Sequence, residues 1–415
     1  MERYRQVACL FVLMFQIIPA VYAKTIKVAK DQNIKSINEA INLADSGDTI
    51  EVKEGIYNEN VIISKTVQLR GINFPSINAG TKGNVITVTA NDVLIEGFKI
   101  ENSGKSSLEE YCGIKAVESS GVIIRNNKFG NNSIGINLRK SNSGIITDNY
   151  ISTSISEMSL LGNAIHCWNS DSLSIKRNKV GKHRDGIYLE FVKDSDIDDN
   201  IVEECVRYGL HFMFSHRDNY KNNIFRRNGA GVAVMYSRQV NMTNNIFEYN
   251  ISDISYGLLL KDISESTISN NLFVKNSIAI YMDGVNKVVL KNNNLIENGL
   301  GIRMVASSGN NLIEENNFSG NTFDITTNGK SLNNKFQKNH WDKYQGYDRD
   351  KDGFGDIPYR PLSIFSVISE YNPMAMLFFH SIIANLLDMA EKVLPIVTPD
   401  NFTDEQPAMK KILND

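Results

Sequence analysis

The chain has 415 residues, with 44 Lys and Arg against 47 Asp and Glu, and its formal net charge is −3. A hydrophobic fraction of 42% with 22% charged residues excludes a disordered chain and a membrane protein with many spans. The near-neutral charge, without a basic block, argues against recognition of nucleic acid phosphates, so we expect no nucleic acid partner.

The first 23 residues have the pattern of a secretory signal peptide. Arg3 and Arg5 precede an apolar run over 7–18, and Val21-Tyr22-Ala23 stands before a cleavage point at Lys24. A retained membrane anchor is the alternative, but the run is short for a bilayer span. We expect residues 1–23 to be removed when the protein is exported.

A short amphipathic helix is predicted next. Ser36-Ile-Asn-Glu39 forms a capping box, and Ile37, Ala40, Ile41 and Ala44 share one face of a helix that ends near Ala44. Such a helix can close the open end of a repeat array, which would otherwise expose its core. Strands at 49–52, 61–63 and 67–70 are expected to begin the array.

A repeat of about 22 residues follows. An apolar residue recurs three positions before an Asn, and these asparagines are Asn127, Asn149, Asn178, Asn200, Asn223, Asn245, Asn271, Asn293 and Asn316. Because a buried amide must find partners, we expect the asparagines to hydrogen-bond from one repeat to the next inside a turn.

A second marker runs in step with the first. A small residue opens a short alternating strand at Gly113, Gly135, Ala164, Gly186, Gly209, Gly231, Gly257, Ala279 and Gly301. Counting the opener as position 1, positions 2 and 4 are apolar in all nine strands, which places them inward and positions 3 and 5 outward. The pattern predicts an all-β protein, a right-handed parallel β-helix over residues 24–340 with about 22 residues per coil. Longer connections before Gly113, Ala164 and Gly257 should bulge from one corner beside these strands.

The outward positions place imidazole and thioether groups together. His211, Met213 and Met235 should point outward from neighbouring coils, and His216 follows where the strand turns. His166, Trp168, Tyr188 and Glu190 should lie one or two coils away, and we treat Trp168, Tyr188 and Glu190 as candidate partner contacts. Imidazole and thioether suit copper, above all Cu(I). The alternative is that the methionines pack under a loop or a partner and that the histidines are ordinary surface groups.

The same face could instead serve sugar chemistry, which needs clustered carboxylates and a base. The candidates are Asp185, Glu190, Asp283, Lys261, His183 and Arg303. The acids are scattered over different coils, so we expect a protein that is not an enzyme. A polysaccharide lyase, a C5-epimerase-like enzyme or a carbohydrate-binding surface protein stays as the alternative.

An Asp-rich segment lies within residues 341–361. Asp348, Asp350, Asp352 and Asp356 alternate around Gly353, as in the first half of a calcium loop. An EF-hand would carry Glu at the twelfth position, where Tyr359 stands. A shorter calcium loop closed by Asp356, or a turn rich in Asp without metal, are both compatible with the pattern.

The last segment, 362–415, does not continue the repeat pattern. A helix with a large apolar surface is predicted over 373–394, and its candidate partner contacts are Met376, Phe378, Phe379 and Leu386. Asp388 and Glu391 make it a poor membrane span. The helix either caps the solenoid or docks on a partner, and the tail after Pro395 is expected to be extended and mobile.

Two segments give the sequence a family resemblance. They are Arg207-Tyr-Gly-Leu-His-Phe-Met-Phe-Ser-His216 and Tyr344-Gln-Gly-Tyr-Asp-Arg-Asp-Lys-Asp-Gly-Phe-Gly-Asp-Ile-Pro-Tyr-Arg-Pro361. Together with the exported β-helix, they resemble the NosD family, periplasmic maturation proteins of nitrous oxide reductase.

The resemblance implies a periplasmic subunit of an ABC transporter with a permease and an ATPase. It further implies copper received from a lipoprotein chaperone and passed to nitrous oxide reductase. Transient copper contact would fall to His211, Met213 and His216, helped by Met235 and His166, and the C-terminal helix would contact the permease. ATP hydrolysis would occur on the partner, because this chain has no G-x-x-x-x-G-K-[ST] loop.

Overall fold

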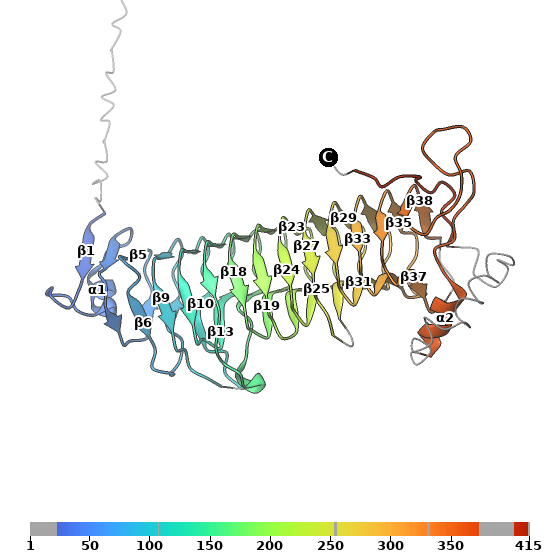
Figure 1. The fold of residues 1–415 in the computed structure, drawn as a ribbon. Coiled ribbons are helices and arrows are strands. Elements are labelled where there is room, and N and C mark those ends of the chain that lie inside the picture. Colours follow the sequence, from blue (N-terminus) through green and yellow to red (C-terminus); the bar gives the residue numbers. More distant parts are fainter. Residues whose placement is uncertain (1–22, 107, 253–254, 330–332, 373–401, 414–415) are drawn as a thin grey trace, which may run out of the picture.

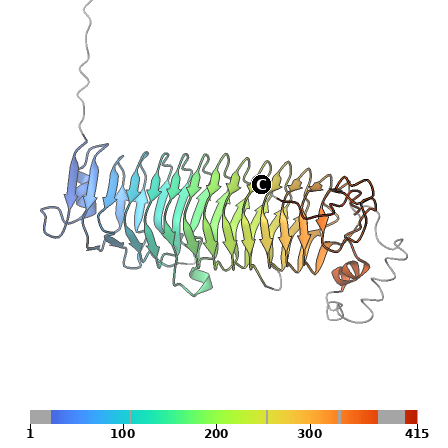
Figure 2. The same cartoon turned by 45° about the horizontal axis from the view of Figure 1, so that its top comes forward.

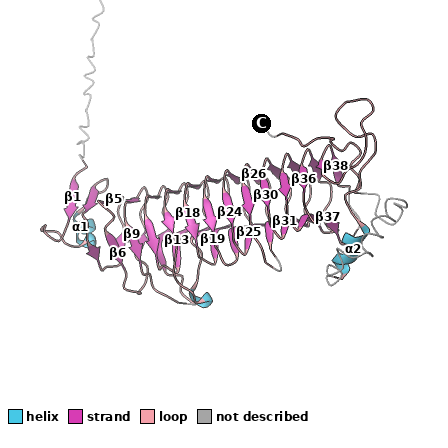
Figure 3. Cartoon of the chain, in the orientation of Figure 1, coloured by secondary structure: helices cyan, strands magenta, loops and turns pink. Residues whose placement is uncertain are grey.

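The computed structural model describes residues 23–106, 108–252, 255–329, 333–372 and 402–413. They form an elongated parallel β-solenoid in which the strands of successive coils stack into three parallel sheets of 14, 13 and 12 strands (Figure 1). The longest sheet has 14 strands, so the solenoid has about 14 coils. The prediction of a parallel β-helix is confirmed. Figure 3 shows how little of the described chain is helical.

Sheet A consists of β1 (Thr25–Val28), β2 (Thr49–Val52), β5 (Gln68–Gly71), β8 (Leu94–Glu96), β11 (Ile123–Arg125), β14 (Ile145–Thr147), β17 (Ser174–Lys176), β20 (Asp196–Asp198), β23 (Asn219–Lys221), β26 (Asn241–Thr243), β29 (Thr267–Ser269), β32 (Val289–Lys291), β35 (Leu312–Glu314) and β38 (Lys335–Gln337). Sheet B consists of β3 (Ile56–Tyr57), β6 (Ser76–Asn78), β9 (Lys99–Glu101), β12 (Lys128–Gly130), β15 (Tyr150–Ile151), β18 (Lys179–Gly181), β21 (Ile201–Glu203), β24 (Ile224–Arg226), β27 (Ile246–Glu248), β30 (Leu272–Val274), β33 (Asn294–Ile296), β36 (Asn317–Ser319) and β39 (His340–Trp341). Sheet C consists of β4 (Val61–Ile63), β7 (Ile86–Val88), β10 (Cys112–Val117), β13 (Ile134–Arg139), β16 (Ile165–Trp168), β19 (Asp185–Glu190), β22 (Tyr208–Met213), β25 (Ala230–Met235), β28 (Tyr256–Lys261), β31 (Ile278–Asp283), β34 (Leu300–Met304) and β37 (Phe323–Thr327).

The predicted alternation lies on sheet C. All residues at positions 2 and 4 of the nine strands, from Ile114 to Met304, are buried in the solenoid core. The strand openers are small for a steric reason. A Cβ on Gly209 would stand 2.6 Å from the carbonyl oxygen of Gly231 in the next coil. Inside, like residues stack along the axis, as in the parallel rings of Phe247 and Phe273 with centroids 4.5 Å apart.

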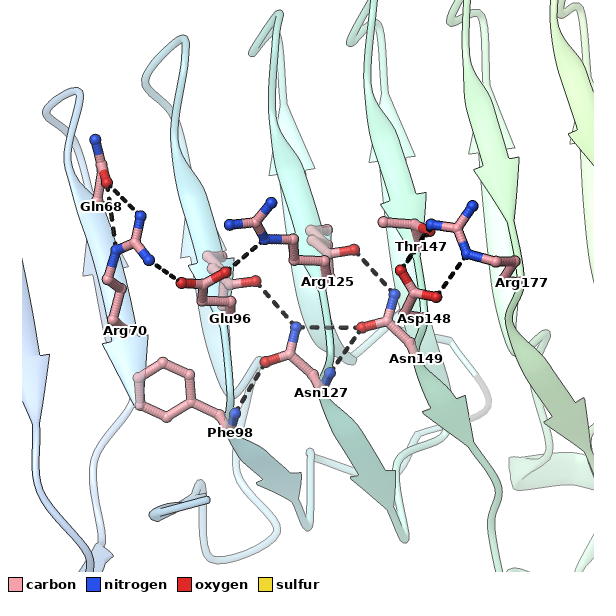
Figure 4. A network of polar contacts seen from close by, with 12 residues as sticks. Gln68, Arg70, Glu96, Phe98, Arg125, Asn127, Thr147, Asp148, Asn149 and Arg177 are labelled. Atoms are coloured by element: carbon pink, nitrogen blue, oxygen red, sulfur yellow. Dashed lines mark hydrogen bonds and ion pairs between the residues drawn. The ribbon is translucent and has the colours of Figure 1, made fainter. Parts of the chain in front are cut away.

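The asparagine column forms the predicted ladder in the turn between sheets A and B. Asn127 donates its Nδ2 to Oδ1 of Asn149 and to the carbonyl of Ile95, and its own Oδ1 accepts from the backbone of Phe98 (Figure 4). The residue before each of these asparagines has a left-handed backbone, with φ of 53° at Asn126. This conformation turns the chain and aims the amide inward.

The N-terminal end is closed as predicted. Helix α1 (Ile37–Leu43) buries Ile37, Ala40 and Ile41 against the first strands. Ser36 caps the helix by accepting from the backbone of Glu39. Glu59, which sequence analysis did not single out, accepts from the backbone N–H groups of Ile37 and Asn38 and completes the cap.

Three long connections precede β10, β16 and β28, as the spacing predicted. They leave the same edge of the solenoid, where one carries the short 3₁₀ helix η1 (Met158–Leu160) (Figures 1 and 2). The first connection returns beside sheet C, because Oε2 of Glu110 lies 3.4 Å from Nη1 of Arg139. This ion pair places the end of the first connection beside the outward face of sheet C.

The C-terminal end corrects the expectation of a mobile tail. Residues 402–413 return to the solenoid, and the buried carboxylate of Asp404 accepts from the backbone of Asn339 and from Nε1 of Trp341. Phe402 is buried, and Asn317 and Ile412 exchange two hydrogen bonds. The tail thus covers an end that would expose core and unpaired strand.

Helix α2 (Ile364–Tyr371) packs on β37, where Phe365 contacts Phe323. The predicted helix over 373–394, with Met376, Phe378, Phe379 and Leu386, lies outside the described residues, as does the signal segment up to residue 22. Every helix within the described ranges falls short of the length and apolar character that crossing a bilayer requires.

Candidate functional site

The candidate site lies on the outward face of sheet C. Position 3 carries Asn137, His166, Tyr188, His211 and Ala233 in register along five neighbouring strands. Position 5 carries, on the same strands, Arg139, Trp168, Glu190, Met213 and Met235. Position 5 is half-buried throughout, whereas position 3 is mostly buried although it points away from the core.

Three aromatic rings of position 3 form a stack. The ring of Tyr188 lies between those of His166 and His211, with centroid distances of 4.8 Å and 4.6 Å. Tyr208 leans against His211 from the start of β22, at 5.0 Å. Because the rings cover one another's faces, His166 and His211 are only 8% and 5% exposed.

The imidazole nitrogens in this stack have no hydrogen-bond partner. Both ring nitrogens of His166 and of His211 are buried, as are both amide atoms of Asn137, and none of them is hydrogen-bonded. Burial lowers the pKa of His166 to about 4, so its imidazole is neutral at pH 7. Buried polar groups are normally paired, so these are the atoms that a bound water, ion or ligand would contact.

An ion pair that sequence analysis missed stands beside His211. Asp185 has a fully buried side chain that receives two hydrogen bonds from the guanidinium of Arg207, and its Oδ2 lies 3.7 Å from Nδ1 of His211. Burial alone would raise the pKa of Asp185, but Arg207 and His211 lower it below its usual value. Asp185 therefore stays anionic and holds a negative charge next to one imidazole.

Two methionine side chains follow His211 and Tyr188 on this face. Met213 and Met235 are paired in register on β22 and β25, which places them on adjacent strands about 4.8 Å apart. The hydroxyl of Tyr188 donates to Sδ of Met213 at 3.5 Å. Burial raises the pKa of Tyr188 to about 12, so the phenol keeps its proton and remains a donor.

The structure divides the predicted copper ligands into three places. His211, Met213 and Met235 share one part of the face. His166 lies two coils from His211 on the opposite face of the Tyr188 ring, roughly 9.6 Å away by strand spacing. Two nitrogens that bind one ion at about 2 Å each stand within about 4 Å of each other, so this arrangement does not let both imidazoles bind the same ion.

His216 lies around a corner from the other candidates. Phe214 turns the chain with φ of 52°, Ser215 points inward, and His216 lies in an open hollow with Lys193 and Arg238. Its Nδ1 accepts from the backbone N–H of Arg238 at 3.3 Å. Burial and the cations around it lower the pKa of His216.

The remaining candidates do not gather into a carboxylate site. Glu190, Met213, Met235, Lys261 and Asp283 follow one another in register, so Glu190 and Asp283 stand four strands apart. His183 is fully buried and bonded to the carbonyl of Gly181, and Arg303 packs over the ring of Tyr281. Of the partner candidates, Trp168 packs under Arg139 and Glu190 lies 3.9 Å from His166.

Three acids of the predicted calcium loop come together. Carboxylate oxygens of Asp348, Asp350 and Asp352 lie within 4.8 Å of one another, and within the described ranges no other group of three His, Cys, Asp or Glu side chains is as close. Asp348 also accepts from the backbone of Lys351 and Gly353. Asp356 is not part of this group of three, and its carboxylate accepts a hydrogen bond from the backbone N–H of Arg349, which joins the two ends of the loop.

Comparisons with known proteins agree with this architecture. The sequence profile described as "periplasmic copper-binding protein (NosD)" matches residues 152–346. A protein of Pseudomonas aeruginosa named "probable ABC transporter binding protein NosD" is 28% identical, over 88% of this chain and 89% of its own length. These matches support a protein of the NosD family.

Solved structures share the fold at low sequence identity. PfbA, a surface adhesin of Streptococcus pneumoniae, superposes with a TM-score of 0.52 at 14% identity, over 73% of this chain and 85% of its own. A family 28 exopolygalacturonase of Yersinia enterocolitica gives a TM-score of 0.55 at 10% identity, over 76% and 78%. These likenesses extend to the solenoid alone.

Proposed function

We propose that this chain is a periplasmic copper-binding protein that works with an ABC transporter and helps to load nitrous oxide reductase. Copper is its cargo, held for a short time on the outward face of sheet C. The observation that carries the proposal is that an imidazole and two thioethers, those of His211, Met213 and Met235, lie on one face of neighbouring strands.

The donor set fits Cu(I) better than other metals. Thioethers are soft ligands that favour Cu(I), and imidazole adds a nitrogen donor of intermediate softness. The carboxylate of Asp185, near Nδ1 of His211, can orient the ring and raise the basicity of the other nitrogen. Tyr188 and Tyr208 cover His211, so copper would reach Nε2 only after a ring moves aside. Such shielding suits a carrier that gives up its ion on contact with a partner.

A chelator competition tests the assignment. The purified protein should hold Cu(I) against a chromophoric chelator under anaerobic conditions, and H211A/M213A/M235A should lose this capacity while keeping its circular dichroism spectrum. The matched control is H340A/M158A, which removes an imidazole and an exposed thioether elsewhere on the surface. Full retention of Cu(I) by the triple variant would refute the site.

The transporter role is tested separately. Membrane association through a permease should depend on residues 373–394, and not on the tail, because residues 402–413 belong to the solenoid end. Replacing 373–394 by a Gly/Ser linker of equal length should release the protein from membranes that contain the permease and ATPase. Unchanged co-sedimentation would refute docking through this segment.

The Asp loop is proposed as a structural calcium site. Carboxylate oxygens are the ligands that calcium prefers, and Asp348, Asp350 and Asp352 already converge. Calcium should raise the melting temperature of the protein, and D350N should abolish the rise. Equal melting curves with calcium and with a chelator would leave the loop as a turn without metal.

A further inference from the structure

Two parallel columns of side chains run along the corner between sheets C and A. Phe191, Phe214 and Tyr236 each follow the last residue of their strand in β19, β22 and β25, and their rings stack at 5.2 Å and 4.9 Å. Two residues further on, Lys193, His216 and Arg238 pair with one another in register. We call the three coils that carry these columns the aromatic–basic corner.

The aromatic column has a left-handed backbone conformation. Phe191, Phe214 and Tyr236 have φ of 54°, 52° and 54°. The same left-handed conformation recurs at turns throughout the solenoid, with φ of 52° at Arg227 and 55° at Tyr249, so the type of residue and not the backbone sets these three coils apart. The equivalent residue is Asn169 in the preceding coil and Asp262 in the following coil. Aromatic rings therefore occupy this turn on three consecutive coils and give way to small polar residues on both sides.

The rings remain in contact with solvent. Phe191 is 42% and Tyr236 is 39% exposed, and Phe214 is half-buried between them. Because each ring covers the face of the next, the column offers solvent mainly ring edges. A sugar ring would stack on a ring face, whereas apolar side chains and carboxylates pack well against the positively polarised edges. This geometry favours a protein partner over a polysaccharide.

The neighbouring column is positive. No carboxylate of the described residues lies within ion-pair distance of Lys193 or Arg238, although Arg217 in the same hollow is paired with Asp194. The two free cations are exposed and stand two coils apart, roughly 9.6 Å. On the flanking coils the same position carries Asp171 and Ser264, so the positive charge is confined to the aromatic–basic corner.

We infer that the aromatic–basic corner is a docking surface for an acidic, apolar segment of a partner protein. The carboxylates of that segment would pair with Lys193 and Arg238, and its apolar side chains would pack on the edges of the three rings. The corner adjoins Glu190, Met213 and Met235, each of which directly precedes one of the rings. The edge of a partner bound at the aromatic–basic corner would lie next to the candidate copper ligands. The proposed docking does not require a bound metal.

Peptide binding measured in a chelator tests the inference apart from copper binding. The probe is a labelled amphipathic helix with Glu on one face and Leu on the other, and two matched peptides carry Lys for Glu or Gln for Leu. We expect the Glu/Leu peptide to bind more tightly than both, and K193E/R238E to weaken its binding about tenfold. F214S/Y236S should weaken it similarly, and the exposed control substitutions K287E and Y249S should leave it unchanged.

Four results would overturn the inference. Equal binding of the three peptides, or no binding of the Glu/Leu peptide, would remove the requirement for an acidic and apolar partner. Tighter binding of polygalacturonate than of the peptide would replace the protein partner by a polysaccharide. Self-association in light scattering that K193E/R238E abolishes would make a second copy of this chain the occupant. Each variant is first checked for an unchanged melting temperature.

Discussion

The hydroxyl of Tyr188 donates a hydrogen bond to Sδ of Met213 at 3.5 Å. Cu(I) would bind through a lone pair of the same sulfur atom, so the phenol competes with the metal for electron density on this thioether. Burial raises the pKa of Tyr188 to about 12, and the competition therefore persists throughout the physiological pH range.

Removing the hydroxyl should strengthen copper binding. In Y188F the ring can keep its stacking on His211, and Met213 loses its donor. A hydrogen bond is worth about 1 kcal/mol net, and one to sulfur somewhat less, so we expect affinity for Cu(I) to rise about two- to fivefold. Y208F is the control, because Tyr208 touches His211 without a bond to sulfur. Weaker binding by Y188F in the chelator competition would mean that the hydroxyl assists the metal.

The ion pair between Asp185 and Arg207 should stabilise the middle of the solenoid. R207M leaves a buried carboxylate without its two strongest donors. Breaking a fully buried pair costs about 3–5 kcal/mol, and we expect about 2–3 here because Arg207 is 45% exposed. R217M is the matched control, because Arg217 and Asp194 make a similar pair in solvent worth about 0–1 kcal/mol.

The cost of R207M should depend on pH. In the wild-type protein the pKa of Asp185 is lowered, so its contribution is present above the unfolded value near 4 and is lost as the pH falls below it. In the variant, burial is opposed only by His211 and the backbone N–H of Tyr208, so the protonated acid is favoured more than in the wild-type protein. Urea unfolding at pH 7 and pH 4 should therefore show a smaller difference between the two proteins at pH 4. An equal difference at both values would contradict this account.

The sequence predicted the solenoid because its repeats are local and strict. Every coil repeats a small opener, two inward apolar residues and an asparagine, and each of these has one steric or hydrogen-bonding reason. Asn228, Asn250, Asn276 and Asn298 form a second ladder that was missed, although each lies five residues after an asparagine of the first. That spacing could have identified it.

The candidate site was predictable only in part. Alternation alone placed His211, Met213 and Met235 on one face. The position before each opener was not assigned to this face, because strict alternation would turn it inward, and Asp185 was named only as a candidate acid for sugar chemistry. There the chain brings Asp185 and Tyr208 to the outward face beside His211. The separation of His166 from His211 by the Tyr188 ring also depends on side-chain stacking, which periodicity does not specify. The packing of the tail through Asp404 joins residues more than sixty positions apart and has no local pattern.

Each asparagine of the ladder should contribute several kcal/mol to the free energy of unfolding. Asn223 accepts from the backbone and the side chain of Asn200, and donates to Oδ1 of Asn245 and to the carbonyl of Ile197. N223A leaves these buried groups without hydrogen-bond partners. At about 1–3 kcal/mol for each group, we expect the free energy of unfolding to fall by at least about 3 kcal/mol. N219A removes the exposed bonds of Asn219 to Asp196 and Asn241 and should cost under about 1 kcal/mol. Similar urea midpoints for the two variants would show that the buried ladder adds little.

Asp218 should make the protein less stable as the pH rises. Its side chain is fully buried, one oxygen accepts from the backbone of Ser195, the other has no partner, and burial raises its pKa to about 8. An acid whose pKa is higher in the folded state binds more protons there, so stability falls between about pH 4 and pH 8.

D218N removes this dependence, because its amide oxygen can still accept from Ser195 and it carries no charge. We expect D218N to match the wild-type protein near pH 4 and to gain stability up to pH 8, by on the order of 2–3 kcal/mol, since each unit of pKa is worth about 1.4 kcal/mol and local relaxation reduces the total. D194N is the control and should have the opposite effect on stability at neutral pH, because Arg217 lowers the pKa of the exposed Asp194. A gain for D218N that does not change between pH 5 and pH 8 would place its origin in packing, and the carboxyl of Asp218 would then not be the titrating group.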